Sequence, residues 1–166
     1  MPVPLYIDTL TDTEIRRIES KLRPGASSTA GFLGPNESLR DVIRQDAEVL
    51  RQKGITHGQI ADFLYNLIQG NAPKGYTVVK NTSKGSQADP FTDELMGGGE
   101  YSNLDITVTN LQGERLAFPG LIIKLIGDYQ FFEGKGTFYR LDPEKAIEFF
   151  GLKSINSSPS SGGQQR

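Results

Sequence analysis

The sequence contains no cysteine, and this absence excludes several kinds of site. Without a thiol the chain cannot form disulfides, use a cysteine nucleophile or build a zinc site that needs cysteine ligands. His57 is the single histidine, so a site that needs two imidazole ligands is excluded as well. We therefore expect neither a metal ion nor a cofactor.

An excess of charge of one sign is also lacking. The 18 basic and 20 acidic side chains are mixed along the chain and give a net charge of −2. Binding to nucleic acid or to anionic lipid usually requires a basic patch, which this pattern does not indicate. No apolar run approaches the roughly 20 residues that span a bilayer, and the N-terminus lacks the features of a secretory signal. The sequence predicts a cytoplasmic protein with neither nucleic acid nor a membrane as partner.

The first 70 residues predict three amphipathic helices with tight connections. The first helix begins at a capping box made by Thr11 and Glu14. The second ends at Gly54, which suits the left-handed position after a helix. A second capping box, Thr56 with Gln59, begins the third helix.

The rest of the chain mixes strand and helix patterns. Three short strands are expected at residues 76–80, 104–109 and 114–118, the last two joined as a hairpin. A helix is expected from Pro119 onward and a further strand at 137–141. Asp142 and Pro143 then begin the last helix, which ends at Gly151.

Together these elements predict a single α+β domain over residues 1–152, with a helical part at 1–72 and a β-rich part at 73–152. In this fold a small antiparallel sheet follows three helices and carries two further helices. The composition of residues 153–166 cannot bury a core, so we expect a disordered tail. The long polar segment 81–101 is the first candidate for a mobile lid or a binding loop.

No residue of the sequence is identifiable as catalytic, but a group around the aromatic region is a candidate ligand site. Its members are Asp128, Glu133, Arg140, Tyr139 and Phe132. Two carboxylates beside one pocket can do acid–base chemistry or bind a ligand. Structural roles explain the same residues, because Arg140 can pair with Glu133 across the intervening turn and aromatic residues usually fill the core.

Three other motifs suggest functions that the sequence does not favour. His57 in the first turn of a helix is expected to be an exposed residue rather than a general base. The loop at 25–35 is expected to cover the surface rather than to form an anion-binding nest. The spacing of acids from Asp89 to Glu100 is similar to that of a calcium loop but lacks the required glycine.

Several sequence motifs occur in an order that resembles an uncharacterised bacterial domain family. They are Gln87 with Pro90 and Phe91, FPGL at 118–121, LI-x-D ending at Asp128, FFEGKGTFYRLDP at 131–143, STAGFLG at 28–34 and GITHGQIAD at 54–62. The resemblance implies no known activity. Family members often carry a cysteine before the Pro-Phe pair and a histidine on the following helix, which implies a metal site. Asp89, Lys124 and Tyr129 occupy these regions here, so the resemblance implies no metal site in this chain.

Three hypotheses for the function follow. The leading one is a non-enzymatic module that binds a protein partner. The alternative is a small-ligand-binding protein or small enzyme, with a pocket between the 81–101 loop and the aromatic region at 118–150. The third is a DNA-binding regulator that uses a degenerate helix-turn-helix at 45–69, which lacks a recognition helix.

Overall fold

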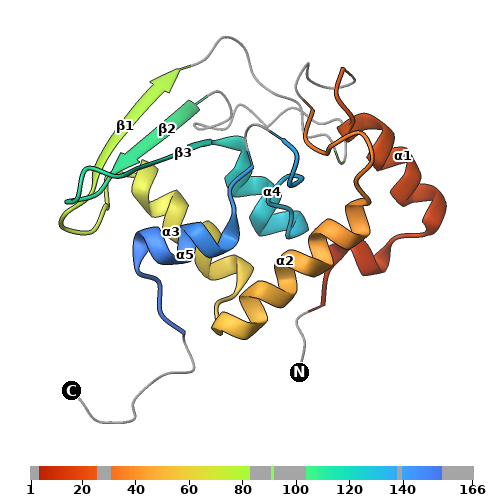
Figure 1. The fold of residues 1–166 in the computed structure, drawn as a ribbon, viewed down its shortest axis with the longest axis horizontal. Coiled ribbons are helices and arrows are strands. Elements are labelled where there is room, and N and C mark those ends of the chain that lie inside the picture. Colours follow the sequence, from red (N-terminus) through yellow and green to blue (C-terminus); the bar gives the residue numbers. More distant parts are fainter. Residues whose placement is uncertain (1–3, 26–30, 83–90, 92–103, 138–139, 155–166) are drawn as a thin grey trace.

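The computed structural model describes residues 4–25, 31–82, 91, 104–137 and 140–154 (Figure 1). The chain has the predicted α+β architecture, with three N-terminal helices, a three-stranded antiparallel sheet and two later helices. A short 3-10 helix, η1 (Tyr6–Thr9), precedes them. None of the helices in these ranges is long and apolar enough to cross a membrane.

The N-terminal helices are α1 (Asp12–Leu22), α2 (Leu39–Lys53) and α3 (His57–Ile68). The capping box of α1 is present, because the Thr11 side chain accepts from Glu14 N and the Glu14 carboxylate accepts from Thr11 N. Gly54 has a φ of 71° and ends α2 as predicted. Thr56 caps α3, but the Gln59 amide donates to the Lys153 carbonyl instead of completing a box.

The sheet has the order β1 (Thr77–Thr82), β2 (Leu104–Thr109) and β3 (Arg115–Pro119). Its register places Lys80, Ile106 and Phe118 in one row and Val79, Thr107 and Ala117 in the next. Neighbouring rows point to opposite faces of a sheet. The buried Ile106 and Phe118 therefore define an inner face, which covers helices α3 and α5 in Figure 1, while Val79 and Ala117 lie on an exposed outer face.

The two later helices are α4 (Leu121–Tyr129) and α5 (Pro143–Phe150). The prediction that Pro119 starts a helix is wrong by two residues, because Pro119 still pairs with Asp105 at the end of β3. Asp142 caps α5, and Gly151 ends it with a φ of 63°, as predicted.

The predicted strand at 137–141 is wrong for the residues that the structure describes there. Thr137, Arg140 and Leu141 belong to no strand, and residues 138–139 lie outside the described ranges. The segment folds back on itself instead, since Thr137 N donates to Gly134 O and Leu141 N to Phe132 O. We call the described residues 130–137 and 140–142 the α4–α5 connection.

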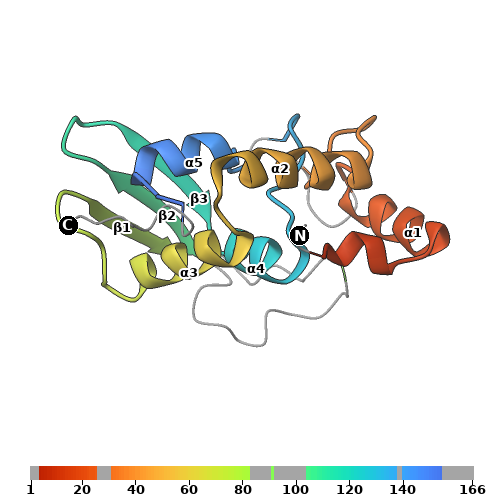
Figure 2. The same cartoon turned by 90° about the horizontal axis from the view of Figure 1, so that it is seen from below.

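One buried cluster of apolar side chains joins the helical and β-rich parts. Figure 2 shows α2 with α5 in one row of helices and α3 with α4 in a second row. Among the fully enclosed side chains are Ile43 of α2, Leu64 of α3, Val108 of β2 and Ile126 of α4. The α4–α5 connection adds Phe131 and Phe132 to the same core, which fixes its polar side chains against α2.

Candidate functional site

The predicted ligand-site residues do not form one group. Asp128 lies on the exposed part of α4, where its Oδ2 atom is 2.9 Å from Nζ of Lys124, one helical turn earlier. Glu133 and Arg140 come together in the α4–α5 connection, whereas Phe132 is a fully buried core residue. Tyr139 lies outside the described residues.

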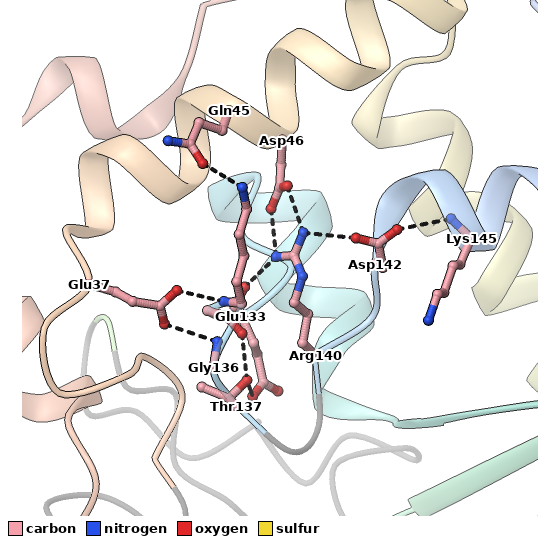
Figure 3. Close-up of polar contacts among 11 residues, drawn as sticks. Glu37, Gln45, Asp46, Glu133, Gly136, Thr137, Arg140, Asp142 and Lys145 are labelled. Carbon is pink, nitrogen blue, oxygen red and sulfur yellow. Dashed lines mark hydrogen bonds and ion pairs between the residues drawn. The ribbon is translucent and has the colours of Figure 1, made fainter.

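Arg140 binds α2 rather than the Glu133 carboxylate that the sequence suggested (Figure 3). Its two terminal nitrogens donate to the two carboxylate oxygens of Asp46 over 2.8 and 2.7 Å. The same nitrogens also donate to the Glu133 carbonyl oxygen at 2.8 Å and to Asp142 Oδ1 at 3.3 Å. The Arg140 and Asp46 side chains are only 9% and 3% exposed, so this is a buried ion pair. We call it the Asp46–Arg140 clamp.

The Glu133 carboxyl is buried without an ion-pair partner among the described residues. Glu133 is 1% exposed, and its Oε1 atom lies 3.5 Å from the Thr137 hydroxyl, which is a long hydrogen bond. Its φ of 72° is unusual for a residue other than glycine. Burial raises the pKa of this carboxyl to about 8, and the Thr137 hydroxyl and the Arg140 charge offset only part of that effect.

The turn after Glu133 surrounds the carboxylate of Glu37. The backbone N–H groups of Lys135 and Gly136 donate to Glu37 over 2.8 and 3.4 Å (Figure 3). Gly34 N donates to the same carboxylate over 2.7 Å. Backbone N–H groups that converge on an anion form a nest. The loop at 25–35 thus contributes one N–H to a nest whose anion is a side chain of the protein itself.

The prediction that His57 is exposed is wrong. The side chain is 7% exposed, and its ring lies 5.7 Å from the ring of Phe132. Its Nε2 atom is buried without a hydrogen-bond partner among the described residues. Burial lowers the pKa of the imidazole to about 4, so His57 is neutral at neutral pH.

An aromatic ring lies where the sequence suggested a pocket. Phe91, the described residue of the 81–101 loop beyond β1, stacks on Tyr129 with a ring separation of 4.1 Å and meets Phe131 edge-on at 5.7 Å. The Phe91 side chain is buried against Tyr129 of α4. Residues 83–90 and 92–101, including most of the Asp89–Glu100 spacing, lie outside the described ranges.

A shallow groove of about 320 Å³ lies over the clamp. It is lined by Gln45, Asp46, Val49, Lys135, Arg140, Asp142, Pro143 and Glu144. The polar groups on its floor already bind one another, and Lys135 Nζ donates to Gln45 Oε1 at 2.5 Å. The groove is therefore lined by charges of both signs, and we identify no nucleophile with an adjacent base among its described residues.

Two residues of this site were missing from the sequence-based candidates. Asp46 falls seven residues after Leu39, on the apolar face of α2, and an acid at that position signals a buried partner. Glu37 had no comparable signal, because two of the three backbone groups that donate to its carboxylate lie 98 and 99 residues away. Comparison of the chain with family models, with curated proteins and with solved structures finds no match.

Proposed function

We propose that the chain is a non-enzymatic protein-binding module and that it binds an extended segment of its partner along the free edge of β1. The observation that carries the proposal is the pairing of β1 with β2 on one side only, within the described residues. An unpaired edge presents a row of backbone N–H and C=O groups, onto which another chain can add a strand.

The sequence of β1 leaves this edge open. The strand Thr77–Thr82 is rich in β-branched residues and has no proline. Its charged residue, Lys80, belongs to the inner row of the sheet, and its Nζ donates to the Ile68 carbonyl at 2.9 Å. Val79 of the outer row is 49% exposed. The outer row can therefore contact the side chains of an added strand.

The charges around β1 favour an acidic partner segment. Residues 70–88 contain three lysines, at 74, 80 and 84, and no acidic residue, although the whole chain has a net charge of −2. An acidic segment would be attracted to this stretch, and a basic one would be repelled. The polar residues of the candidate site support a structural role, since Arg140 donates to both Asp46 and Asp142.

The proposal can be tested by selecting ligands from a library of random peptides with the full chain. We expect the selected peptides to be acidic and rich in strand-forming residues. In the isotope-labelled protein, their binding should shift the amide resonances of Thr77–Thr82 more than those of the helices. Selected peptides that are basic, or that shift the amide resonances of another surface, would contradict the proposal.

A pair of charge reversals provides the control. Lys74→Glu should weaken the binding of a selected peptide about three-fold, because one surface charge contributes only modestly to affinity. Lys153→Glu makes the same change at an exposed lysine beside the opposite end of α3. It should leave the affinity unchanged. Equal effects of the two substitutions would mean that the peptide responds to net charge rather than to the β1 edge.

A second candidate function is a small-ligand site or small enzyme near Glu133. The buried Glu133 carboxyl and the unpartnered Nε2 atom of His57 favour it, because displaced pKa values often mark functional sites. A small molecule that raises the melting temperature of the wild-type chain but not that of Glu133→Gln would support this alternative. The DNA-binding hypothesis has less support, since α3 is followed by β1 rather than by a recognition helix.

A further inference from the structure

The α4–α5 connection holds an acid in a place that suits its neutral form. The Glu133 side chain is almost fully enclosed, and its hydroxyl partner Thr137 is 3.5 Å away. A buried carboxylate normally needs a cation or several N–H donors to offset the loss of water. Glu133 has neither among the described residues, so its neutral form fits this position better than its ionised form.

The nearest guanidinium is already committed to other acceptors. The terminal N–H groups of Arg140 donate hydrogen bonds to Asp46, to Asp142 and to the backbone carbonyl of Glu133. If Glu133 lost its proton with its surroundings unchanged, the carboxylates of Glu133, Asp46 and Asp142 would share one guanidinium. Two of them, Glu133 and Asp46, would be buried. Such an excess of buried negative charge is costly unless water reaches it.

The other charged and titratable groups around Glu133 do not relieve this excess. Glu37 faces the same turn, but its carboxylate accepts hydrogen bonds from backbone N–H groups and brings no positive charge. Lys135 turns its ammonium group to Gln45 on α2, at the protein surface. His57 of α3, whose ring contacts Phe132, is held neutral by burial and brings no positive charge.

From this geometry we propose that the α4–α5 connection is a proton-controlled latch, in which opening of the connection away from α2 releases the proton of Glu133. The closed form keeps Glu133 neutral and the Asp46–Arg140 clamp intact. The open form exposes Glu133 to water, where it ionises. Rising pH therefore favours the open form, and the contacts of the connection with α2 and with the loop at Phe32 weaken together.

Two backbone amides report on this opening. Gly134 N donates to Phe32 O over 2.8 Å, and Lys135 N donates to the Glu37 carboxylate over 2.8 Å, so both bonds join the connection to residues outside it. Their protection against hydrogen exchange, relative to the unfolded chain at the same pH, measures how often the connection opens. Between pH 6.5 and 8 we expect protection to fall about tenfold per pH unit, because each opening releases one proton. This window lies above the ordinary pKa of 6.5 for His57, which would take up a proton on exposure at lower pH.

Substitution of the acid should remove the pH dependence. In Glu133→Gln we expect the protection of the Gly134 and Lys135 amides to be flat across the same window, whereas the matched substitution Glu144→Gln should keep the wild-type slope. Glu144 is an exposed acid in the first turn of α5 and pairs with Lys53. A slope that persists in Glu133→Gln would overturn the proposal.

A measurement on the wild-type chain covers the case in which Glu133→Gln does not fold. The side-chain carboxyl carbon of Glu133 can be followed by NMR through the pH range. A midpoint well above the usual range for a glutamate supports the latch. A midpoint near 4.5, the ordinary value for this side chain, would overturn it, because the closed form would then hold no extra proton.

Discussion

At the scale of single residues, the contact between Gly134 and Glu37 explains why glycine stands in the turn of the α4–α5 connection. A Cβ atom added at Gly134 would collide with the Glu37 carboxylate and lie 3.1 Å from Leu33 Cα. We predict that Gly134→Ala lowers the free energy of unfolding by about 1–3 kcal/mol, as overpacking against backbone usually does. Chemical denaturation measures the loss.

Gly136, two residues later, is the matched control. A Cβ atom there would meet nothing nearer than Glu37 Oε1 at 3.8 Å, and Gly136 is not among the residues with positive φ. Gly136→Ala should therefore change the free energy of unfolding by less than about 1 kcal/mol in either direction. Similar losses for the two alanines would show that the nest does not depend on the close approach at Gly134.

The partners of single polar residues were the least predictable feature of the chain. No pattern in the sequence distinguishes Glu133 from Asp46 as the partner of Arg140, because Asp46 lies 94 residues away. Proximity along the chain favoured Glu133, but Glu133 offers Arg140 its backbone carbonyl instead of its carboxylate. The burial of His57 was unpredictable for a related reason, since its ring contacts Phe132, which is distant in the sequence and not revealed by the local pattern around α3.

At the scale of secondary structure, most signals that lie within a few residues predict the observed helix ends, with the Thr56–Gln59 capping box and the helix start at Pro119 as exceptions. The capping box at Thr11, the left-handed Gly54 and the Asp142 cap all depend on contacts within one helical turn. The strand predicted at 137–141 failed because a strand needs a neighbour. The connection makes a backbone hydrogen bond within itself, from Leu141 N to Phe132 O. Its described residues do not join the sheet.

The N-terminus of α5 gives a prediction at this scale. Asp142 accepts a hydrogen bond from Lys145 N as the helix cap and a second from Arg140. Asp142→Ala should lower the free energy of unfolding by about 1 kcal/mol, the usual cost of losing such a cap, and more if the contact with Arg140 also contributes. Glu144→Ala, in the same helical turn, removes only an exposed ion pair with Lys53 and should cost less than about 0.5 kcal/mol. Thermal unfolding compares the two variants.

At the scale of the whole molecule, two buried titratable groups give stability an unusual dependence on pH. Glu133 binds a proton more tightly in the folded chain, with a pKa of about 8 against the ordinary 4.5. It therefore weakens folding as pH rises from 4.5 to 8. His57 binds a proton less tightly when folded, with a pKa of about 4 against 6.5, so it weakens folding as pH falls from 6.5 to 4.

The two effects oppose each other between pH 4.5 and 6.5. Each changes the free energy of unfolding with pH by the amount that one proton gives, in opposite directions, so the two changes cancel. From these groups we predict a flat maximum of stability in that range. Above pH 6.5 only Glu133 acts, and the free energy of unfolding should fall by on the order of 2 kcal/mol by pH 8. Urea denaturation at half-unit steps of pH measures the curve.

Glu133→Gln separates the two contributions, because glutamine has the shape of the protonated carboxyl but cannot ionise. With the His57 effect alone, stability should rise from pH 4 to 6.5 and then stay level to pH 8. A variant curve that still falls above pH 6.5 would trace the alkaline loss to other groups. A wild-type curve that rises through this range would mean that the Glu133 carboxylate is accommodated in the core, and the closed α4–α5 connection would then be compatible with its charged form.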